Sequence, residues 1–424
     1  MKFIYILSLL LISTVAFCVI QEPTCRCDPN TFSIMPWDGQ MSEGSIVDID
    51  EHFKDMYDMG FNVTGFITAD ELPKAKKHKL MATLRYKPLI NIYAGKMTNP
   101  EKEAQKWANE LKGKIEKNLK NIYQIYIIDE PFIKDAKTVS AYAKACKEIL
   151  GVRPYVNFNP NYAPASVFEG IAYKEYLNSF LNICPLDYIS YDNYSFFQVK
   201  GFDEDRFYSN IEEIRNIANN HNMNFVNTIL SVGHYNYADP DDFSIGVQGW
   251  STLAYGGKGL SYFTVRKSMT NGYRYAAYDK VGNKTPVWYA IQRMNYSIHN
   301  IMPYYKNLTC INTFHIGNIP KGCKGIESSK NLKNLVITIN SHPEGYNPKA
   351  NVLVGEFTDK NNKEYVIIVN KDPQWSCFVS NIEFNKGKDI TLIRDWNLEN
   401  KEIPFTSSGN KYIIPGQGIL LKAE

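Results

Sequence analysis

The 424-residue chain is predicted to be an α/β protein, a (β/α)8 TIM barrel followed by a small C-terminal antiparallel β-sandwich. From about Thr31 to Leu308, short apolar runs alternate with longer amphipathic runs, as in repeated strand–helix units. Eight such units in this length are what a (β/α)8 barrel requires. After Leu308 the pattern changes to period-two runs separated by turns, which predicts the sandwich.

Each predicted barrel strand is a short run of mostly apolar, β-branched or aromatic residues. In chain order the runs are Phe32–Asp38, Asn62–Thr68, Leu89–Tyr93, the start of Ile122–Phe132, Tyr155–Phe158, Leu186–Tyr191, Phe225–Val232 and Leu260–Val265. The helices between and after them are predicted at Val47–Met59, Leu72–His78, Pro100–Leu119, Thr138–Leu150, Tyr173–Asn182, Phe207–His221, Phe243–Tyr255 and Pro286–Met302. A doubly wound open sheet would normally carry a Gly-rich phosphate turn after its first strand, and Trp37-Asp38-Gly39-Gln40 is not one.

The sandwich strands follow as alternating runs between turn residues. They are predicted at Val352–Phe357, Tyr365–Val369, Ser376–Phe384, Ile390–Trp396 and Lys411–Leu421. The expected organisation is therefore a signal peptide (1–18), a short Cys-containing segment (19–30), the barrel (31–308) and the sandwich (309–424).

The first 18 residues have the pattern of a secretory signal peptide. Lys2 is followed by an apolar run from Phe3 to Leu11 and then by small residues. No later segment offers 18 uninterrupted apolar residues, so the mature chain is expected to be secreted, or to lie in the secretory or lysosomal lumen, without a membrane anchor. The net charge of only +3 and the lack of a basic stripe argue against nucleic acid as a partner. Nothing in the sequence indicates an oligomeric state.

Removal of the signal peptide takes away Cys18 and leaves seven cysteines, an odd number. Cys310 with Cys323 is the first expected disulfide, because it closes a short loop, and Cys146 with Cys184 is the second. Cys25-Arg-Cys27 lacks the usual two-residue spacer of a zinc site, so no metal or organic cofactor is predicted.

Five Asn-X-Ser/Thr acceptors occur in the chain, which predicts a glycoprotein if the host glycosylates its exports. They begin at Asn62, Asn193, Asn283, Asn295 and Asn307.

Two carboxylates, Asp129 and Glu130, stand at the carboxyl end of the fourth predicted strand, before Pro131. Catalytic groups of (β/α)8 barrels are mounted at that end of the strands. Apolar neighbours such as Ile128 and Phe132 would remove water from these carboxyl groups and raise their pKa towards that of a proton donor. The alternative is an N-cap or a loop salt bridge for the next helix.

Polar and aromatic residues end five other predicted strands, and a closed barrel brings all of these ends to one rim. They are Trp37, Asp38, Asn157, Asn159, Asp192, Tyr194, His234 and Arg266. Carboxylates with amides and aromatic rings on one rim are the groups that glycoside hydrolysis uses. Glu130 is the expected general acid and Asp192 the second carboxylate, while Asp129 and the remaining seven are expected to contact the carbohydrate. For these residues, capping, core packing and an Asp38–Arg266 pair are the structural alternatives.

With Asp129-Glu130-Pro131 at strand four and an antiparallel domain after the barrel, the chain resembles the clan A glycoside hydrolases, including family 42-like β-galactosidases. Val156-Asn-Phe-Asn-Pro-Asn-Tyr162, Ile189-Ser-Tyr-Asp-Asn-Tyr194 and Leu253-Ala-Tyr-Gly-Gly-Lys-Gly-Leu-Ser-Tyr-Phe-Thr264 also resemble segments of uncharacterised TIM-barrel glycosidases. The resemblance spans roughly Thr31 to Glu424. The clan carries Asn-Glu-Pro at strand four, so it implies that Glu130 is the acid/base and that Asp129 replaces the Asn.

The sequence departs from that clan at strand seven, where the clan places its nucleophilic Glu and this chain has Leu230-Ser-Val-Gly-His-Tyr235. Three explanations follow. Asp192 could be the nucleophile or base, with a carboxyl separation of about 5–5.5 Å for retention and about 6.5–9.5 Å for inversion. The Asp129-Glu130 pair also resembles the acidic pairs of substrate-assisted N-acetylhexosaminidases, in which the acetamido group of the substrate attacks. Finally, the barrel could be a catalytically inactive glycan-binding protein.

Overall fold

The structure is a computed structural model that describes residues 22–23, 25–38, 48–87, 97–266, 272–339, 349–387, 389–396, 401–406 and 411–424. Within these ranges, eight parallel strands form one sheet in the order β1-β11-β9-β6-β5-β4-β3-β2. Their bounds are β1 Ser33–Pro36, β2 Val63–Ile67, β3 Met81–Leu84, β4 Ile122–Asp129, β5 Arg153–Phe158, β6 Tyr188–Asn193, β9 Asn224–Leu230 and β11 Gly259–Phe263.

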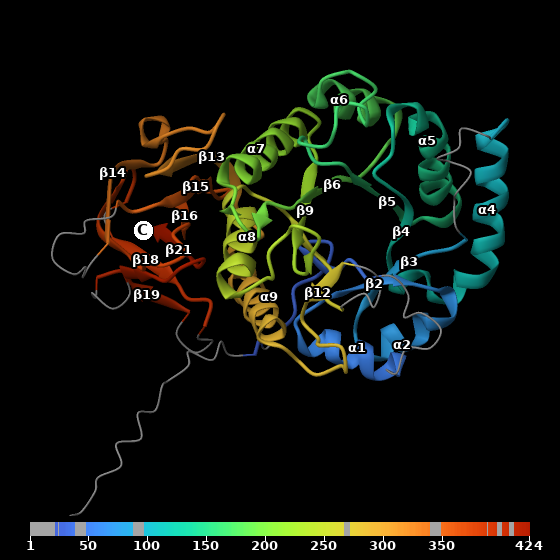
Figure 1. The fold of residues 1–424 in the computed structure, drawn as a ribbon, viewed down its shortest axis with the longest axis horizontal. Coiled ribbons are helices and arrows are strands. Elements are labelled where there is room, and N and C mark those ends of the chain that lie inside the picture. The colour runs from blue at the N-terminus through green and yellow to red at the C-terminus, as the bar shows by residue number, and fades with distance from the viewer. Residues whose placement is uncertain are drawn as a thin grey trace, which may run out of the picture.

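The two ends of this sheet meet, which closes the barrel. The backbone N–H of Asn62 donates to the carbonyl of Ile34 at 3.2 Å, and that of Phe66 donates to the carbonyl of Asp38 at 2.9 Å. Figure 1 shows the helices as a ring around the strands, the arrangement expected of a (β/α)8 barrel. The carboxyl ends of all the barrel strands therefore share one rim.

The main helices are α1 Ile49–Asp58, α2 Leu72–Lys77, α4 Pro100–Ile115, α5 Ala136–Ala145, α6 Tyr173–Ile183, α7 Glu204–Asn220, α8 Asp242–Ala254 and α9 Pro286–Tyr305. Short helical turns are η1 Ala69–Glu71, η2 Glu116–Asn121, η3 Ile133–Asp135, η4 Cys146–Leu150 and η5 Ile326–Ser328. Side chains of Asp48, Asn99, Asp203 and Asp241 accept hydrogen bonds from first-turn N–H groups. These caps fix where α1, α4, α7 and α8 begin.

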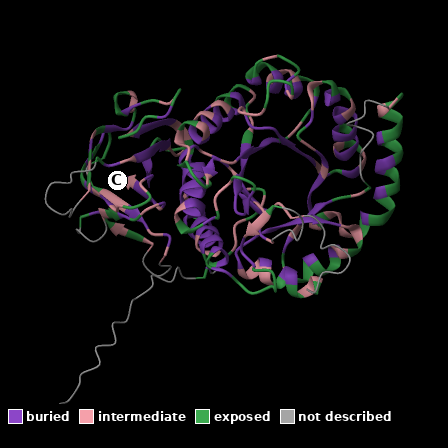
Figure 2. Ribbon diagram, viewed as in Figure 1, coloured by how far each residue is buried: buried purple, intermediate pink, exposed green. Residues whose placement is uncertain are grey.

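Helix α8 differs from the other barrel helices because it is buried on all sides. Every residue from Ser244 to Ala254 is buried, whereas α4 exposes the charged face of an amphipathic helix to solvent (Figure 2). The C-terminal domain covers the outer face of α8. A Cβ at Gly355 would lie 2.0 Å from the carbonyl of Ala254, and one at Gly418 would lie 2.6 Å from the ring of Trp250, so glycine is required at both contacts.

The C-terminal domain is a sandwich of two antiparallel sheets. The larger sheet has the order β13 Thr309–Ile316, β15 Val352–Thr358, β16 Glu364–Asn370, β21 Gly418–Ala423, β18 Ile390–Ile393 and β19 Glu402–Pro404. The smaller sheet contains β14 Leu332–Ile339, β17 Cys377–Phe384 and β20 Tyr412–Ile413. Apolar side chains of both sheets, including Val354, Ile368 and Val379, form one buried core between them.

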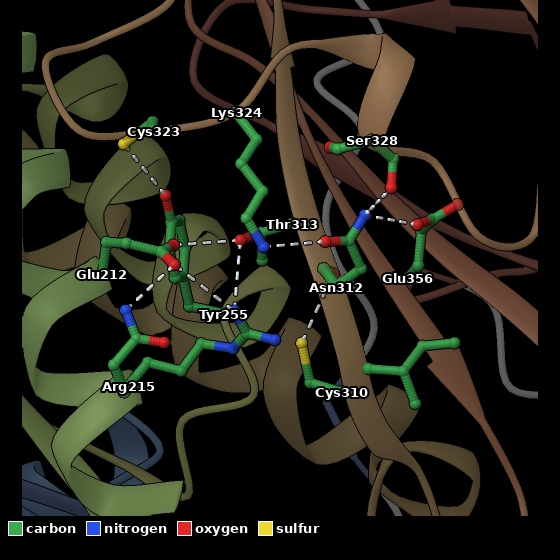
Figure 3. A network of polar contacts seen from close by, with 12 residues as sticks. Glu212, Arg215, Tyr255, Cys310, Asn312, Thr313, Cys323, Lys324, Ser328 and Glu356 are labelled. Carbon is green, nitrogen blue, oxygen red and sulfur yellow. Dashed lines mark hydrogen bonds and ion pairs between the residues drawn. The ribbon is translucent and has the colours of Figure 1, made fainter.

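A polar network joins α7 of the barrel to the sandwich (Figure 3). The hydroxyl of Thr313 on β13 donates to Glu212 at 3.1 Å and accepts from the guanidinium of Arg215 at 3.4 Å. Next to it, the amide of Asn312 donates to Glu356 at 2.8 Å. Because these groups are buried, their hydrogen bonds replace the water that they lose when the two domains pack.

Both domains need a correction to the predicted strand pattern. The run Leu89–Tyr93 lies outside the described residues, and the third barrel strand is instead the four-residue Met81–Leu84. In the sandwich, the predicted strand Lys411–Leu421 is divided between β20 and β21, which belong to different sheets. Strands β13, β14 and β19 were not expected. The alternation of buried and exposed residues along β14 is interrupted, and its pairing with β17 is shifted at two bulges, so the period-two signal is weak there.

Neither predicted disulfide is present, since each of the seven cysteines that the structure describes is a free thiol. The sulfur atoms of Cys310 and Cys323 have different partners, the carbonyl of Asn312 and the hydroxyl of Tyr255 (Figure 3). Cys146 and Cys184 are both buried, and the nearby Cys184 contributes to the raised pKa of Cys146 after burial itself.

Three of the five glycosylation acceptors are core residues. Asn62, Asn193 and Asn295 are buried and hydrogen-bonded to neighbouring groups, while Asn283 and Asn307 are exposed. A glycan could therefore be attached to the folded chain only at the exposed pair among these five. In the part of the chain that the structure describes, no helix combines the length and apolar character needed to cross a membrane.

Candidate active site

The amide of Asn157 holds a cluster of carboxyl groups at the ends of β4, β5 and β6. Its Nδ2 donates to Asp129 Oδ1 at 3.1 Å and to Asp192 Oδ1 at 2.8 Å. Its Oδ1 accepts from the hydroxyls of Ser190 at 2.8 Å and Thr228 at 3.3 Å. Since hydroxyl donors occupy the amide oxygen, the NH2 group must face the two aspartates.

Parallel pairing explains why these residues meet. Asp129 on β4 is in register with Asn157 on β5, and Asn157 is in register with Ser190 on β6. Asp192 follows two positions later on β6, so its side chain points to the same face of the sheet as that of Ser190. The cluster is a consequence of strand register at the barrel rim.

Glu130 stands on top of this cluster in a left-handed backbone conformation. Its φ is +48°, which for a residue with a side chain is disfavoured by about 1–2 kcal/mol. The conformation is held because its N–H donates to the carbonyl of Asn157 at 2.8 Å. Asp192 lies close enough to Glu130 to lower the pKa of its carboxyl group, while Glu130 stays exposed at the rim. Backbone strain at one exposed carboxylate is typical of functional positions.

Crowding and burial raise the pKa of each carboxyl group in the cluster. Burial raises the pKa of Asp129 to about 7, against the opposing hydrogen bond from Asn157. Burial, followed by the charges of Asp129 and Glu130, raises the pKa of Asp192 well above its ordinary value. Burial also raises the pKa of Glu130, and the bond to Asp192 opposes this. The cluster therefore retains at least one proton near neutral pH, as a proton donor requires, while another of its carboxyl groups can be ionised.

Tyr194 connects the cluster to the opposite side of the mouth. Its hydroxyl hydrogen-bonds the carboxyl of Asp192. Its backbone is fixed at both ends, because its N–H donates to the hydroxyl of Tyr162 at 2.5 Å and its carbonyl accepts from Arg206 Nε at 3.1 Å. The guanidinium of Arg206 lies 3.5 Å above the ring of Tyr162. Tyr162 and Arg206 thus position Tyr194, and sequence patterns singled out neither for this role.

Aromatic rings line the side of the mouth formed after β9 and β11. His234 stacks on Tyr273 with ring centroids 5.1 Å apart and contacts the ring of Phe263 at 5.4 Å. Tyr194 packs on Phe263 at 5.2 Å. His234 Nδ1 lies 3.1 Å from the carbonyl of Val232, to which it donates, and burial lowers the His234 pKa. His234 is therefore a neutral ring of this wall.

The remaining predicted residues lie around the cluster without joining it. Trp37 packs edge-on against Phe66 at 4.8 Å and against Tyr155 at 5.7 Å inside the barrel. Tyr155 in turn hydrogen-bonds Ser190, and Ser190 donates to Asn157, so Trp37 is separated from Asn157 by two residues. Asn159 is buried, and its Nδ2 has no hydrogen-bond partner among the described residues.

Asp38 and Arg266 meet, but not as the expected side-chain pair. The carboxyl of Asp38 accepts from the backbone N–H groups of Val265 at 3.2 Å and Arg266 at 3.3 Å, and burial raises its pKa to about 7. The guanidinium of Arg266 instead donates to His52 Nδ1 at 2.9 Å and lies 4.1 Å from the centroid of the Tyr278 ring. Arg266 therefore does not contact Asp129 or Glu130, while Asp38 ties the end of β1 to the end of β11.

Two clefts of the described surface lie outside the carboxyl cluster. One, of about 440 Å³, is lined by residues of α6, α7 and the sandwich, including Glu213 and Lys321. The other, of about 450 Å³, lies after β2 and β3 and includes Arg85 and Tyr86.

Among the described residues, no group of three or more His, Cys, Asp or Glu side chains is arranged to hold a metal ion.

Comparison with known proteins finds no matching family model and no matching curated protein. The β-galactosidase of the psychrophilic Marinomonas ef1 aligns over 65% of this chain and 62% of its own, with 8% identity and a TM-score of 0.46. The β-amylase catalytic domain of Paenibacillus polymyxa aligns over 64% and 98%, with 8% identity and a TM-score of 0.45. A triply substituted endo-β-1,4-glucanase of Xanthomonas axonopodis pv. citri aligns over 58% and 90%, with 10% identity and a TM-score of 0.43. Similarity at this level does not assign an activity or a substrate to the present chain.

Proposed function

We propose that the protein is a glycoside hydrolase in which Glu130 is the general acid. The observation that carries this proposal is the set of three carboxyl groups at the carboxyl ends of barrel strands: Asp129 and Asp192, both hydrogen-bonded to Asn157, and the neighbouring Glu130, whose pKa Asp192 shifts. Glu130 is the exposed member, so it can reach a glycosidic oxygen, and the buried Asp192 next to it helps to set its pKa. Cleavage of the C–O bond needs such a donor because the departing alkoxide is a poor leaving group.

The placement of the carboxyl groups favours a nucleophile that comes from the substrate. Hydrolysis by two enzyme carboxyl groups places them on opposite faces of the sugar, about 5–5.5 Å apart for retention or about 6.5–9.5 Å apart for inversion. Glu130 and Asp192 interact closely enough to shift each other's pKa, and Asp129 is tethered beside Asp192 through one amide nitrogen. The described segment Leu230–Tyr235 at the end of β9 carries no carboxylate that could act from the opposite face.

We therefore propose a 2-acetamido-2-deoxy sugar as the reacting unit. Its acetamido oxygen attacks the anomeric carbon as Glu130 gives its proton to the departing oxygen, which forms a cyclic oxazolinium ion and a free alcohol. Asp129 accepts a hydrogen bond from the acetamido N–H and stabilises the positive charge that develops there. Glu130, now a carboxylate, removes a proton from water as that water opens the ring, which restores both the acetamido group and the acid. The anomeric configuration is retained.

The test is hydrolysis of matched nitrophenyl glycosides that differ only at C2, carrying either an acetamido group or a hydroxyl. We expect turnover of the acetamido glycosides alone, and loss of about 10²–10⁴-fold in kcat for Glu130→Gln. Turnover of the hydroxyl series would contradict substrate assistance but keep the hydrolase. Unchanged turnover in Glu130→Gln would refute the assignment of the acid.

A glycan-binding protein without turnover is the competing proposal, favoured by the absence of a carboxylate in the described segment Leu230–Tyr235 at the end of β9. Calorimetric binding of an N-acetylated oligosaccharide with no release of product over days would support it. Secretion through the predicted signal peptide also remains a proposal, and the position of the N-terminus in protein recovered from the medium would test it.

A further inference from the structure

Tyr235 is an exposed aromatic ring that the fold holds in place beside the proposed active site. It follows β10 (Gly233–His234), which pairs with β12 (Tyr273–Tyr275) in a two-stranded sheet over the barrel mouth (Figure 1). Its side chain is 68% exposed, although large aromatic side chains usually bury most of their surface.

The backbone of Tyr235 is strained, with φ at +45°. Tyrosine has no intrinsic preference for this left-handed region, so the surrounding contacts must stabilise it. The N–H of Tyr235 donates to the carbonyl of Gly272 at 3.2 Å. Its carbonyl accepts from Gln198 Nε2 at 3.2 Å and from Arg274 Nη1 at 2.9 Å. Three hydrogen bonds, two to the segment around β12 and one to Gln198, therefore fix a conformation that would otherwise be disfavoured.

Further contacts fix the ring and the turn that carries it. Arg274 also donates to the carbonyl of Tyr237 at 2.6 Å and to Asp239 at 3.1 Å, so it bridges the turn. The ring of Tyr235 lies 5.5 Å from that of His234, and a Cβ at Gly272 would lie 3.0 Å from it. Gly272, with φ at +90°, thus leaves space for the ring.

A continuous series of contacts leads from the carboxyl cluster to this ring. Asp192 hydrogen-bonds Tyr194, the ring of Tyr194 lies 6.4 Å from His234, and His234 contacts Tyr235. Asp192 and His234 are buried and Tyr194 is half-buried, so Tyr235 is the one exposed member of this series. A chain of sugars bound at Glu130 and continuing along this wall would meet the face of Tyr235 at its outer end.

We propose that Tyr235 is a stacking subsite for a sugar unit of the same glycan that lies beyond the cleaved bond. This inference rests on the proposed function. The C–H face of a pyranose ring is apolar and its edges are polar, which matches an exposed aromatic ring whose backbone is held by polar side chains such as Gln198 and Arg274. The protein is then selective for oligosaccharides over single-sugar glycosides.

The experiment compares kcat/KM for an N-acetylated tetrasaccharide with that for a single-sugar nitrophenyl glycoside. For Tyr235→Ala we expect a loss of about tenfold on the tetrasaccharide and less than about twofold on the single-sugar substrate. Tyr235→Phe and Tyr235→Trp should retain the wild-type ratio, since stacking does not need the hydroxyl. Tyr412→Ala is the matched control, because that tyrosine is 46% exposed but lies in the sandwich.

The outcomes separate this inference from the proposed function. If wild-type protein cleaves both substrates and Tyr235→Ala lowers neither rate, or lowers both equally, the subsite is refuted and the hydrolase stands. If Tyr235→Phe loses as much as Tyr235→Ala on the tetrasaccharide, a polar contact replaces stacking and the inference also fails. If wild-type protein cleaves no glycoside, the proposed function fails first, and the subsite falls with it.

Discussion

The two sides of the barrel mouth are built from the same kind of strand but carry different chemistry. The ends of β4, β5 and β6 present Asp129, Glu130, Asn157 and Asp192, while the described ends of β9 and β11 lead into His234, Phe263 and Tyr273. We call these the acidic side and the aromatic side. When both carboxylates of a barrel hydrolase come from one side, they cannot face each other across the sugar. From this difference we expect the acidic side to carry out proton transfer and the aromatic side to bind the sugar.

The largest expected effect concerns Asp129. Asp129→Asn keeps the size of the side chain but removes the negative charge that stabilises a positive acetamido group, so kcat should fall by about 10²-fold or more. The same change should leave KM within a few-fold. His234→Phe on the aromatic side should cost far less in kcat, because that ring contributes no proton. Steady-state kinetics on an acetamido glycoside measures both variants, and equal losses would contradict the division of roles.

Asn157 should come next. Asn157→Ala removes the one amide nitrogen that hydrogen-bonds both aspartates, so the half-buried Asp129 and the buried Asp192 would each lose that donor. We expect kcat to fall by about 10–100-fold, with the acidic limb of the pH–rate profile moved to higher pH, because the lost bond lowers the pKa of Asp129 and Asp192. Asn159→Ala is the control, since the Asn159 amide nitrogen has no partner in the described chain. If the acidic limb of the pH–rate profile does not move in Asn157→Ala, Asn157 has only a structural role.

Tyr194 joins the two sides, and its loss should have a smaller effect. Tyr194→Phe keeps the ring on Phe263 but removes the hydroxyl that bonds Asp192. A loss of about tenfold in kcat is expected for one neutral hydrogen bond near the reacting groups. Tyr194→Leu should lose more, because the aromatic side is disturbed as well. If Tyr194→Phe behaves like the wild type, the hydroxyl does not act on the carboxyl cluster.

The smallest expected effect is on the free energy of unfolding. Its pH dependence has one sign for Asp129 on the acidic side and the opposite sign for His234 on the aromatic side. The folded pKa of Asp129 is raised from 3.8 to about 7, so between these values the folded protein holds a proton that the unfolded chain has lost. Stability contributed by this proton is present at low pH and is lost as pH rises towards 7. The folded pKa of His234 is lowered from 6.5, so its contribution is present above that value and is lost on acidification.

The unfolding free energy of the wild type should therefore fall between about pH 4 and pH 7. Asp129→Asn should reduce that fall by on the order of 1 kcal/mol. His234→Phe should instead flatten the loss below about pH 6.5. Urea titrations at closely spaced pH values measure both slopes. Identical pH dependence in wild type and Asp129→Asn would show that Asp129 titrates normally in the folded state.

Sequence periodicity was sufficient for the barrel because buried parallel strands and amphipathic helices have different periods. It also placed Glu130, Asp129, Asn157, Asp192 and Tyr194 together, since parallel strand ends share a rim. The third strand was misplaced because Met81–Leu84 offers only four residues of apolar pattern. An apolar run of four residues is too short to be distinguished from the surrounding sequence as a strand.

Other features of the site depend on contacts that have no local pattern. Arg206 lies on α7 and Tyr162 lies in a turn after β5, yet together they fix Tyr194. Tyr162 meets Tyr194 across 32 residues of sequence and Arg206 meets it across 12, so no local periodicity links the three. The strain at Glu130 and Tyr235 is likewise imposed by distant hydrogen bonds and not by the residues themselves.

Helix α8 contributes side chains to the cores of both domains. Its inner face packs against the barrel, and Trp250 on its outer face lies against Gly418 of the sandwich. Leu353, Ile367 and Leu420 of the sandwich accordingly belong to the same apolar cluster as the barrel residues. The sandwich is thus not an interchangeable module appended to a finished enzyme. A substitution on either face of this helix is felt by both domains, so barrel and sandwich can change in evolution only as a matched pair.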